Sequence, residues 1–575
     1  MLPLSLNRTN ILLVVIMVEL SYPGVYIIEV PPALRAITAA STSTAAFIGM
    51  AEKGPVNEAR RVTSFMDFLE TFGGFTTKEA LNIEDKSTPP NNDIYLPYAV
   101  WAFFQNGGRM CYIIRLAPDA KPSSIEVPRK GSSAAAFTVS AISPGEMGNK
   151  LFVAVTEGTI DLPGPPDDPT KRKPTYKIVV TTDEGRTLLE SFDGVTMDKD
   201  ADNSIDAYIN GNSRYIRISD VKPGTIPKLK PQPASSSGTG TSPTPSGEGT
   251  PTPSGVGTAV VTVQDAGYRL EKATPGRDVT DGDVVDQLTV GKSALDKLTD
   301  VSLIAAPGFT SFEVINAGFT YAERHRNGMG DAFFIADVPV RIEDKNEVVD
   351  FVKDKLFQPN NNGYGALYFP WIYARDQLAK GRNRKIQLPP SGFIAGIYAR
   401  IDNVRGVWKA PAGTEAGVSG HQGLTATLTD MDQGVINLAG VNALRTFAGY
   451  GMVAWGSRTV SHDIAWRYVP VRRMANFLKS SIYDGIQWAV FEPNDAPLWD
   501  ALRLTIGGFM MDLFRQRALQ GSTPEEAFFV KCDSETTTET DQQNGIVNIQ
   551  LGFAPLKPAE FVVVRLSQKV AQQQT

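Results

Sequence analysis

Side chains that could carry out acid–base or metal chemistry are scarce in this chain. Among its 575 residues there are only three histidines, His325, His421 and His462, and two cysteines, Cys111 and Cys532. None of the histidines stands in the H-E-x-x-H spacing of a zinc protease, and two cysteines can form at most one disulfide bond. A Cys/His zinc cluster cannot be assembled from so few ligands. We therefore expect neither a metal nor a cofactor.

Motifs for nucleotide binding and acyl transfer are also missing. Residues 291–293 (GKS) resemble the end of a phosphate-binding loop, but Asp286 stands where that loop needs its first glycine, and its carboxylate would repel a phosphate. No G-x-G-x-x-G and no G-x-S-x-G pattern occurs. His325 and the His462-Asp463 pair could contribute to a catalytic triad, but we favour structural or surface roles for them.

Two carboxylates, Asp337 and Glu492, lie in apolar stretches of the sequence. A pair of acids whose pKa values differ can act as general acid and general base. Ion pairing with arginines such as Arg472 or Arg473 is the simpler interpretation, and we favour it. The sequence thus predicts a protein that is not an enzyme.

The composition is that of a soluble globular protein. The formal net charge is −6, with 42% hydrophobic and 21% charged residues, so a surface that coats nucleic acid is excluded and we expect no nucleic acid partner. The apolar run at residues 11–18 is far shorter than the about 20 residues of a membrane-spanning helix. We expect no direct membrane insertion, and either Met1 or Met17 could be the natural start.

The length of 575 residues predicts about three to four domains. Residues 33–117 alternate between strand-like and helix-like stretches, among them a buried strand at 44–50, a helix at 96–105 and a strand at 110–116. The same alternation returns after residue 290. We predict a mixed α/β fold whose core is assembled from an N-terminal part, 33–117, and a core and C-terminal part, 291–555.

A different pattern fills residues 118–290, where short alternating runs are separated by turn residues. This pattern favours an inserted, β-rich outer domain. Within it, residues 231–256 consist mainly of Pro, Gly, Ser and Thr, and such a segment cannot bury enough apolar surface to become ordered. We expect a flexible surface loop there, with an O-glycosylated stalk as the alternative.

Several helices are predicted in the second α/β part. Apolar spacing and capping signals place them at 312–326, at 391–401, from about 474 to 488 and at 496–520. Residues 432–445 are expected to form a loop with a turn.

Sequence blocks in the C-terminal half, and two near the N-terminus, carry a family resemblance. In chain order they are YPGVY (22–26), FIG (47–49), PPSG (389–392), AGIYAR (395–400), RGVWKAP (405–411), NALR (442–445), WGSRT (455–459), RYVPVRR (467–473), FEPN (491–494) and APLKPAEF (554–561). These blocks resemble the contractile tail sheath family of phages. The resemblance covers about residues 22–116 and 290–570 and is loose in the β-rich middle.

The resemblance implies a structural subunit that forms a homo-oligomer, a helical or stacked-ring sheath around an inner tube. Contraction of the sheath would drive the tube through a target envelope. An inner tube protein, a baseplate and a terminal cap are the implied partners. The particle would be a phage tail or a phage-tail-like contractile injection system, assembled in the cytoplasm and either released or anchored to a membrane through its baseplate. A sheath-like baseplate or cap component and an α/β hydrolase-like enzyme using His462 are the alternatives.

Terminal arms of the sheath proteins that this chain resembles add strands to neighbouring subunits, a form of β-augmentation. Strand-like segments lie near both ends of this chain, in an N-terminal lead and arm at 1–32 and a C-terminal arm at 556–575. The alternative is that both strands complete the subunit's own sheet. The residues assigned to the arms are Val25, Tyr26, Ile27, Ile28, Glu29 and Val30, and Phe561, Val562, Val563, Val564, Arg565 and Leu566.

A tube-facing surface is expected in the C-terminal domain. Arg503, Arg515 and Arg517 belong to the predicted helix at 496–520 and could meet an acidic tube. The alternative is a solvated helix end, where positive charge interacts favourably with the helix dipole.

Overall fold

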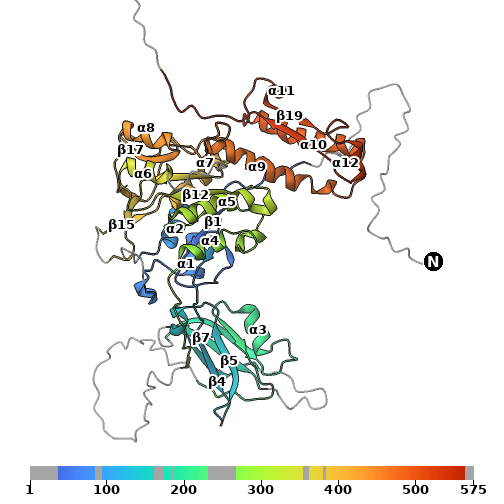
Figure 1. Cartoon of the computed structure of the whole chain (residues 1–575). Helices are drawn as coiled ribbons and strands as arrows, with labels where there is room; N and C mark the ends of the chain where they lie inside the picture. The colour runs from blue at the N-terminus through green and yellow to red at the C-terminus, as the bar shows by residue number, and fades with distance from the viewer. Residues whose placement is uncertain are drawn as a thin grey trace, which may run out of the picture.

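The computed structural model describes residues 36–84, 93–160, 174–182, 186–230, 267–353, 362–379 and 384–563. It has three parts (Figure 1): a central α/β domain, an outer domain formed by residues 124–270, and a C-terminal lobe formed by residues 469–553. The outer domain and the C-terminal lobe project from the central domain at two different places, so the molecule is elongated.

An eight-stranded sheet forms the middle of the central domain, in the order β18-β17-β13-β12-β11-β1-β3-β2. The inner strands run parallel, and the edge strands β18 and β2 are antiparallel to their neighbours. The strands are β1 (Ala45–Gly49), β2 (Ala59–Val62), β3 (Cys111–Arg115), β11 (Leu303–Ala305), β12 (Phe333–Asp337), β13 (Gly365–Phe369), β17 (Val441–Phe447) and β18 (Gly451–Ala454). Parallel strands covered on both faces are apolar along their length, and every residue of β1 is buried.

Strand β1 joins the two halves of the sheet. Although it comes from the N-terminal part of the chain, it lies between β3 and β11, and Ala45 is in register with both Cys111 and Leu303. Segments more than 250 residues apart in the sequence therefore share one sheet. This confirms the mixed α/β fold predicted from the sequence.

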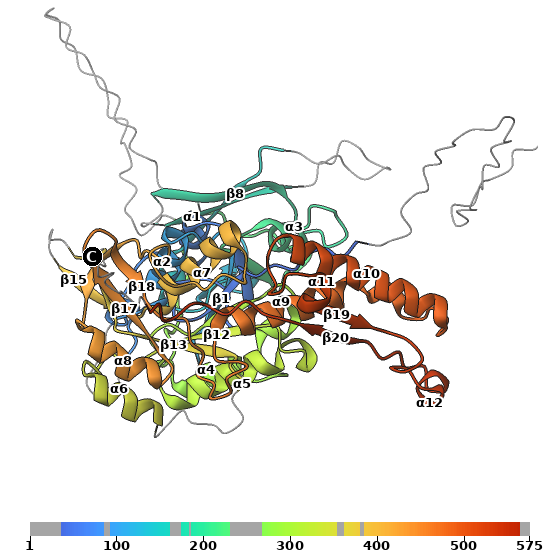
Figure 2. The ribbon, with the colours of Figure 1, turned by 90° about the horizontal axis from the view of Figure 1, so that it is seen from above.

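Helices cover both faces of the sheet (Figure 2). Alternate residues of β1 supply the two cores, with Phe47 on one face and Ile48 on the other. The first face is covered by α1 (Phe65–Phe72), α2 (Leu96–Gln105) and α7 (Ser391–Arg405), and the second by α4 (Asp281–Gln287), α5 (Phe312–Gly328), α6 (Lys345–Phe351) and α8 (Asp430–Leu438).

Helices α2 and α7 approach each other closely because α7 carries glycine at the contact. A Cβ atom on Gly392 would lie 2.6 Å from the backbone of Ala99, and one on Gly396 would lie 2.5 Å from the carbonyl oxygen of Phe103. A larger residue at either position would push the helices apart. This contact sets the short distance between the two helices.

The prediction of a loop at residues 432–445 is wrong, because this region contains most of α8 and the start of β17. Thr429 and Asp432 form a capping box that starts the helix. Gly434 lies within the helix and weakens the helical pattern in the sequence. The helix predicted at 496–520 is also shorter than expected and ends at Arg515.

The outer domain is a two-sheet structure with its own apolar core (residues 127–270). One sheet has the order β10-β6-β7-β8 and the other β4-β5-β9. Its elements are β4 (Ser124–Pro128), β5 (Ala135–Ala141), β6 (Phe152–Glu157), β7 (Tyr176–Thr182), β8 (Thr187–Val195), α3 (Ile205–Asn212), β9 (Ile216–Ser219) and β10 (Tyr268–Arg269). The segment 231–256 lies outside the described residues. Helix α4, which falls within the span 118–290, packs on the central sheet.

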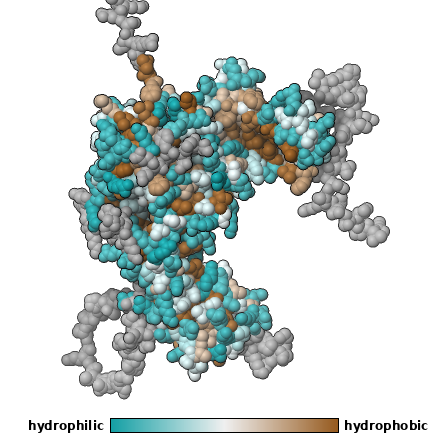
Figure 3. All heavy atoms as spheres, viewed as in Figure 1, coloured by the Kyte–Doolittle hydropathy of each residue, from teal (hydrophilic) through white to brown (hydrophobic). Residues whose placement is uncertain are grey.

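The C-terminal lobe consists of two long helices and a two-stranded sheet. Met474 and Phe477 of α9 pack against Ile506, Phe509 and Met510 of α10. The elements are α9 (Val469–Gly485), α10 (Ala496–Arg515), α11 (Pro524–Ala527), β19 (Phe528–Lys531), α12 (Glu539–Gln543) and β20 (Gln550–Phe553). Figure 3 shows an apolar area on the surface of this lobe.

The remaining elements are short. A three-stranded sheet, in the order β15-β14-β16, lies against the core on the α2–α7 face. Its strands are β14 (Ile372–Arg375), β15 (Lys385–Leu388) and β16 (His421–Leu424), and the 3-10 helices are η1 (Glu79–Leu81), η2 (Glu146–Lys150), η4 (Ala294–Lys297) and η6 (Gln487–Ala489). None of the described helices is both long enough and apolar enough to span a bilayer.

Candidate functional site

A crevice lies between the carboxyl ends of β1 and β11. From β1 the chain continues to β3 on one side, whereas β11 leads to β12 and β13 on the other side. Open α/β sheets bind ligands where the strand order reverses in this way. Here Tyr95 packs over Gly308 and meets the ring of Trp371 at 5.3 Å. The remaining cavity of about 80 Å³ is far smaller than the roughly 300 Å³ of a small-molecule site.

Asp337 has a positioning role next to this crevice. It ends β12, and its carboxylate accepts hydrogen bonds from the backbone N–H and the hydroxyl of Ser391, both at 2.7 Å. Burial raises the pKa of Asp337 to about 7, against the opposing effect of the Ser391 hydrogen bonds. The carboxyl group therefore holds the first residue of α7.

The expected ion pairs between the acids and Arg472 or Arg473 do not form among the described residues. Arg473 pairs with Asp402, and both side chains are 3% exposed. Arg472 lies over the ring of Trp466 at 3.4 Å. Glu492 is exposed and stands outside the core. Arg473 is thus paired with a carboxylate 71 residues away, and Arg472 stacks on an aromatic ring.

The three histidines are held apart by the fold. His325 is buried at the end of α5, with Nδ1 at 2.6 Å from Oδ1 of Asp331, and Oδ2 of Asp331 accepts a hydrogen bond from Ser480 of α9. His421 begins β16, and His462 is exposed in the loop before α9. In the part of the chain that the structure describes, no three His, Cys, Asp or Glu side chains gather as metal ligands would.

A cluster of polar side chains anchors the C-terminal segment at Glu560, close to the last described residue. Oε1 of Glu560 accepts hydrogen bonds from Nε of Arg458 at 2.8 Å and from Nδ2 of Asn437 at 2.7 Å. Oε2 of Glu560 accepts from Nη2 of Arg458 at 2.6 Å and from the hydroxyl of Tyr468 at 3.2 Å. We call these four residues the exit clamp.

The exit clamp keeps its charges although it is largely shielded from water. The side chains of Arg458 and Glu560 are 10% and 19% exposed. Burial opposes ionisation of Glu560, but the hydrogen bonds from Arg458 and Asn437 outweigh it and lower the pKa of the carboxyl group. Burial and the nearby Glu560 raise the pKa of Tyr468, which therefore donates its proton in the hydrogen bond. A two-point guanidinium–carboxylate pair of this kind fixes direction as well as distance.

The N-terminal segment is held at its root by α9. The backbone N–H of Ala40 donates to the hydroxyl of Ser481 at 3.0 Å, and Arg473 donates to the carbonyl oxygen of Thr42 at 2.8 Å. Ile37 packs against Gly485, where a Cβ atom would lie 2.6 Å from the isoleucine. Residues 36–44 thus lie along the lobe helix before the chain enters β1.

The residues predicted to form the arms lie at the limit of the described structure. Val25–Val30 and Val564–Leu566 fall outside the described residues. Phe561, Val562 and Val563 follow the exit clamp directly and are 76%, 81% and 80% exposed. Three consecutive apolar side chains are therefore presented to solvent immediately after a firmly held anchor.

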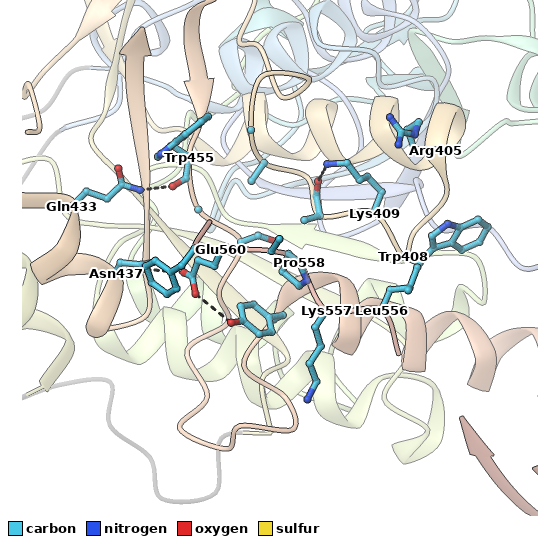
Figure 4. A pocket seen from close by; sticks show the side chains of 18 of the residues that line it. Arg405, Trp408, Lys409, Gln433, Asn437, Trp455, Leu556, Lys557, Pro558 and Glu560 are labelled. Atoms are coloured by element: carbon cyan, nitrogen blue, oxygen red, sulfur yellow. Dashed lines mark hydrogen bonds between the residues drawn. The ribbon is translucent and has the colours of Figure 1, made fainter. Parts of the chain in front are cut away.

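A large cavity adjoins the exit clamp, where the central domain meets the root of the C-terminal lobe (Figure 4). Its volume is about 810 Å³. Its walls come from α8, from the loops that follow α7 and β18, from the end of α10 and from residues 556–561. Positive side chains dominate its charged lining, with Arg405, Lys409, Arg445, Arg517 and Lys557 against Asp430 and Glu560. We call it the basic cavity.

The three arginines predicted to contact a tube do not form one surface. Arg503 pairs with Asp500, and Arg515 pairs with Asp512, each three residues earlier on α10. Arg517 lies beyond the helix end with a positive φ of 58° and lines the basic cavity. Arg503 and Arg515 are thus candidates for a contact along α10, whereas Arg517 belongs to a different site.

The sheet of the C-terminal lobe has free edges. Strands β19 and β20 pair with each other from Phe528↔Phe553 to Lys531↔Gln550, and no third strand joins them among the described residues. An uncovered edge offers backbone N–H and C=O groups to another chain. An edge of this kind can accept a strand from another chain.

The exit clamp was not predicted as a site. Arg458, Tyr468 and Glu560 stand in sequence blocks that carry the family resemblance, whereas Asn437 does not. Glu560 and Arg458 are 102 residues apart. The signal that could have indicated the pair is the single acidic residue in the block at 554–561, next to apolar residues. Such a carboxylate needs a cationic partner once the segment is partly buried.

Comparisons with protein families find two adjoining matches. Residues 282–460 match the family described as phage tail sheath protein central domain, and residues 461–569 match the phage tail sheath C-terminal domain. Together these matches cover just over half of the chain.

Two curated proteins show the same likeness in sequence. The tail sheath protein of Vibrio phage KVP40 is 30% identical over 139 residues, which cover 24% of this chain and 21% of that protein. The tail sheath protein of Burkholderia phage BcepMu is 31% identical over 144 residues, covering 23% of this chain and 29% of that protein. The chain matches less than a third of the length of either relative.

Solved structures show the likeness in fold. The sheath complex of PVC, an extracellular contractile injection system, in its contracted state has a TM-score of 0.53 at 22% identity, covering 96% of this chain and 99% of that chain. The sheath tail protein of Listeria innocua has a TM-score of 0.56 at 12% identity, covering 90% and 96%.

Proposed function

This chain belongs to the phage tail sheath family, and we propose that it is the structural subunit of a contractile sheath. Many copies polymerise as a helical or stacked-ring array around an inner tube, and the array contracts to drive the tube through a target envelope. The observation that carries this function is the match of two consecutive sheath domains over residues 282–569. It is supported by a fold that follows a contracted sheath over 96% of the chain.

The terminal segments connect neighbouring subunits in this proposal. Each is anchored where it leaves the fold, residues 36–44 by α9 and residues 556–560 by the exit clamp. Beyond the second anchor, Phe561, Val562 and Val563 are exposed. Burying a Val or Phe side chain against a neighbour stabilises by about 1.5–3 kcal/mol. Three such side chains would make each link strong.

The free edges of the β19–β20 sheet are the acceptor in a neighbouring subunit. Main-chain hydrogen bonds supply most of the affinity when a strand is added to an edge. Such a ladder can stay paired while the rigid domains rotate about the residues between anchor and ladder. The array therefore remains connected during contraction.

The other partners belong to the same proposal. An inner tube protein would contact the exposed side of α10, where Arg503 and Arg515 are 44% and 72% exposed. A baseplate and a terminal cap would bind the two ends of the array. The assembled particle would be a phage tail or a tail-like injection particle, built in the cytoplasm and then released or anchored through the baseplate.

Electron microscopy of the purified full-length chain tests the function. We expect long striated tubes in negative stain, either from the chain alone or after co-expression with a tube protein encoded nearby. Tubes that exist in a long, narrow and a short, wide form would establish contraction. A chain that stays monomeric over a wide range of salt and protein concentrations, with and without the tube protein, would contradict the proposal.

A further inference from the structure

The basic cavity has a charged counterpart at the opposite end of the C-terminal lobe. Residues 486–500 and 533–546 contain seven acidic residues and neither lysine nor arginine. The two segments touch, because Nδ2 of Asn494 donates to the carbonyl oxygen of Ile546 at 3.1 Å. Figures 1 and 2 show α12, which lies in the second segment, at the far end of the lobe. We call these two segments the acidic tip.

Part of the charge at each place is not neutralised within the subunit. At the acidic tip, Asp500 pairs with Arg503 and Glu535 with Lys531, whereas Glu492 and Glu539 form no ion pair with any described residue and are exposed. The tip therefore keeps a local excess of negative charge.

The basic cavity shows the reverse situation. Arg405 pairs with Glu415 and Arg445 with Asp430. Among the described residues, Lys409 donates to the carbonyl oxygen of Ala410 and forms no ion pair. Arg517 and Lys557 are exposed and form no ion pair with a described residue either. Three cations around this cavity therefore have no ion-pair partner among the described residues of the subunit.

The two places cannot meet within one subunit. Helix α10 starts at the acidic tip and ends beside the basic cavity, and its 20 residues span about 30 Å. The helix is packed along α9 and cannot fold back. A contact between tip and cavity must therefore join two copies of the chain.

We propose that the acidic tip of one subunit docks into the basic cavity of a second copy of this chain. A cavity of about 810 Å³ accommodates several side chains of the tip. The contact is heterologous, since each copy contributes a different surface, and repeated heterologous contacts that do not close into a ring generate a helical filament. The inference deepens the proposed sheath function, because it assigns an assembly contact separate from strand exchange.

The contact also gives the polymer a direction. Every subunit carries one tip and one cavity. A growing polymer therefore always has a free tip at one end and a free cavity at the other. Charge complementarity of this kind mainly selects register and increases the rate of association. It weakens as salt rises, because exposed charges are screened over about 8–10 Å at physiological ionic strength.

Disulfide cross-linking between two variants, each with one introduced cysteine, tests the contact directly. Both natural cysteines, Cys111 and Cys532, are buried, so introduced surface cysteines react selectively. Full-length Arg517→Cys is mixed with full-length Glu539→Cys under mild oxidation, at low and high salt. We expect a disulfide-linked heterodimer at low salt and about tenfold less of it at high salt.

The matched control is Lys222→Cys. It places the introduced cysteine at an exposed position of the outer domain, which is remote in the sequence from the C-terminal lobe. Mixing it with Glu539→Cys should give only background cross-linking. Equal yields for Lys222→Cys and Arg517→Cys would overturn the proposal. An absence of heterodimer when tubes form normally would also overturn it.

Charge reversal gives a second, independent readout. Glu492→Lys with Glu539→Lys should reduce assembly about tenfold at a given concentration, and so should Lys409→Glu with Arg517→Glu. All four changes in one chain should restore assembly, because the attraction is then reversed but present. Loss of assembly without restoration would contradict the contact. Cross-linking without tubes would instead count against the sheath function while leaving the contact intact.

Discussion

Glu560 lies within hydrogen-bonding distance of Arg458 at two points, with Oε2 at 2.6 Å from Nη2 and Oε1 at 2.8 Å from Nε. The arginine comes from the loop after β18 of the central domain, and the glutamate comes from the last described residues of the chain. The two-point contact fastens the C-terminal segment to the central domain just before the last described residues. In the proposed sheath, the strength of this anchor would limit the force that the segment transmits to a neighbouring subunit.

Breaking this pair should release the C-terminal segment. In Arg458→Ala, Glu560 loses two hydrogen bonds and its counter-charge but stays partly buried. This should reduce the free energy that holds the C-terminal segment on the central domain by about 2 kcal/mol. We expect amide hydrogen exchange at residues 554–560 to become at least about tenfold faster. Mass spectrometry of exchanged peptides measures this change.

The matched control for that variant is Arg405→Ala. Arg405 also pairs with a glutamate, Glu415, but both side chains are about half exposed, at 49% and 48%. Exposed pairs contribute less than about 1 kcal/mol. Equal exchange rates in the two variants would show that the exit clamp is no stronger than a surface pair.

Asp337 should make stability depend on pH between about 4 and 7. Its pKa is raised from 3.8 to about 7 in the folded chain, because it is buried. The folded state therefore holds a proton that the unfolded state has lost in this range, and stability falls as pH rises through it. The decline amounts to at most about 4 kcal/mol.

Urea unfolding of the wild type and of Asp337→Asn, followed from pH 4 to pH 8, checks this expectation. The asparagine can still accept from the backbone of Ser391 but does not titrate, so its stability should decline less with pH. Asp500→Asn, at an exposed surface position, should keep the wild-type slope. Parallel curves for wild type and Asp337→Asn would refute the assignment.

The contact between α2 and α7 should tolerate no side chain at Gly396. A Cβ atom there would lie 2.5 Å from the carbonyl oxygen of Phe103, and overpacking of this kind costs about 1–3 kcal/mol. We expect a lower melting temperature for Gly396→Ala by calorimetry. Gly507→Ala is the control, since it also lies inside a helix but has nothing within 4 Å of the added atom; it should be neutral or slightly stabilising.

Removing residues 1–30 should abolish the sheath without unfolding the subunit. The root of the segment, at residues 36–44, stays bound to α9 through Ala40 and Thr42. We expect soluble monomers with unchanged circular dichroism and no tubes in negative stain. Normal tubes from the truncated chain would mean that the N-terminal strand does not link subunits.

Reversing the charge at Arg515 should weaken assembly on a tube. The side chain is 72% exposed and faces solvent beside Asp512, so Arg515→Glu leaves the fold intact but makes this part of α10 acidic. Co-sedimentation with tubes of the inner tube protein measures binding. Tube-templated assembly equal to that of the wild type would remove Arg515 from the contact.

Local patterns in the sequence were enough to predict the class of fold and several elements of the central domain. The apolar run at 44–50 became β1, and the segment 391–401 became the first part of α7. Residues 432–445 were predicted wrongly because glycine at position 434 obscured the helical pattern of α8. The blocks in the C-terminal half also indicated the family, since they preserve residue identity in order along the chain.

Only the tertiary structure decided which charged residues meet. Asp337 was expected to pair with an arginine but holds Ser391, 54 residues away, and Glu560 meets Arg458, 102 residues away. Arg517 was grouped with Arg515 by sequence spacing, yet the helix ends between them and directs Arg517 to the basic cavity. Periodicity records which face of an element is buried, but the partner of a charge depends on where distant segments are brought together by the packing of the core.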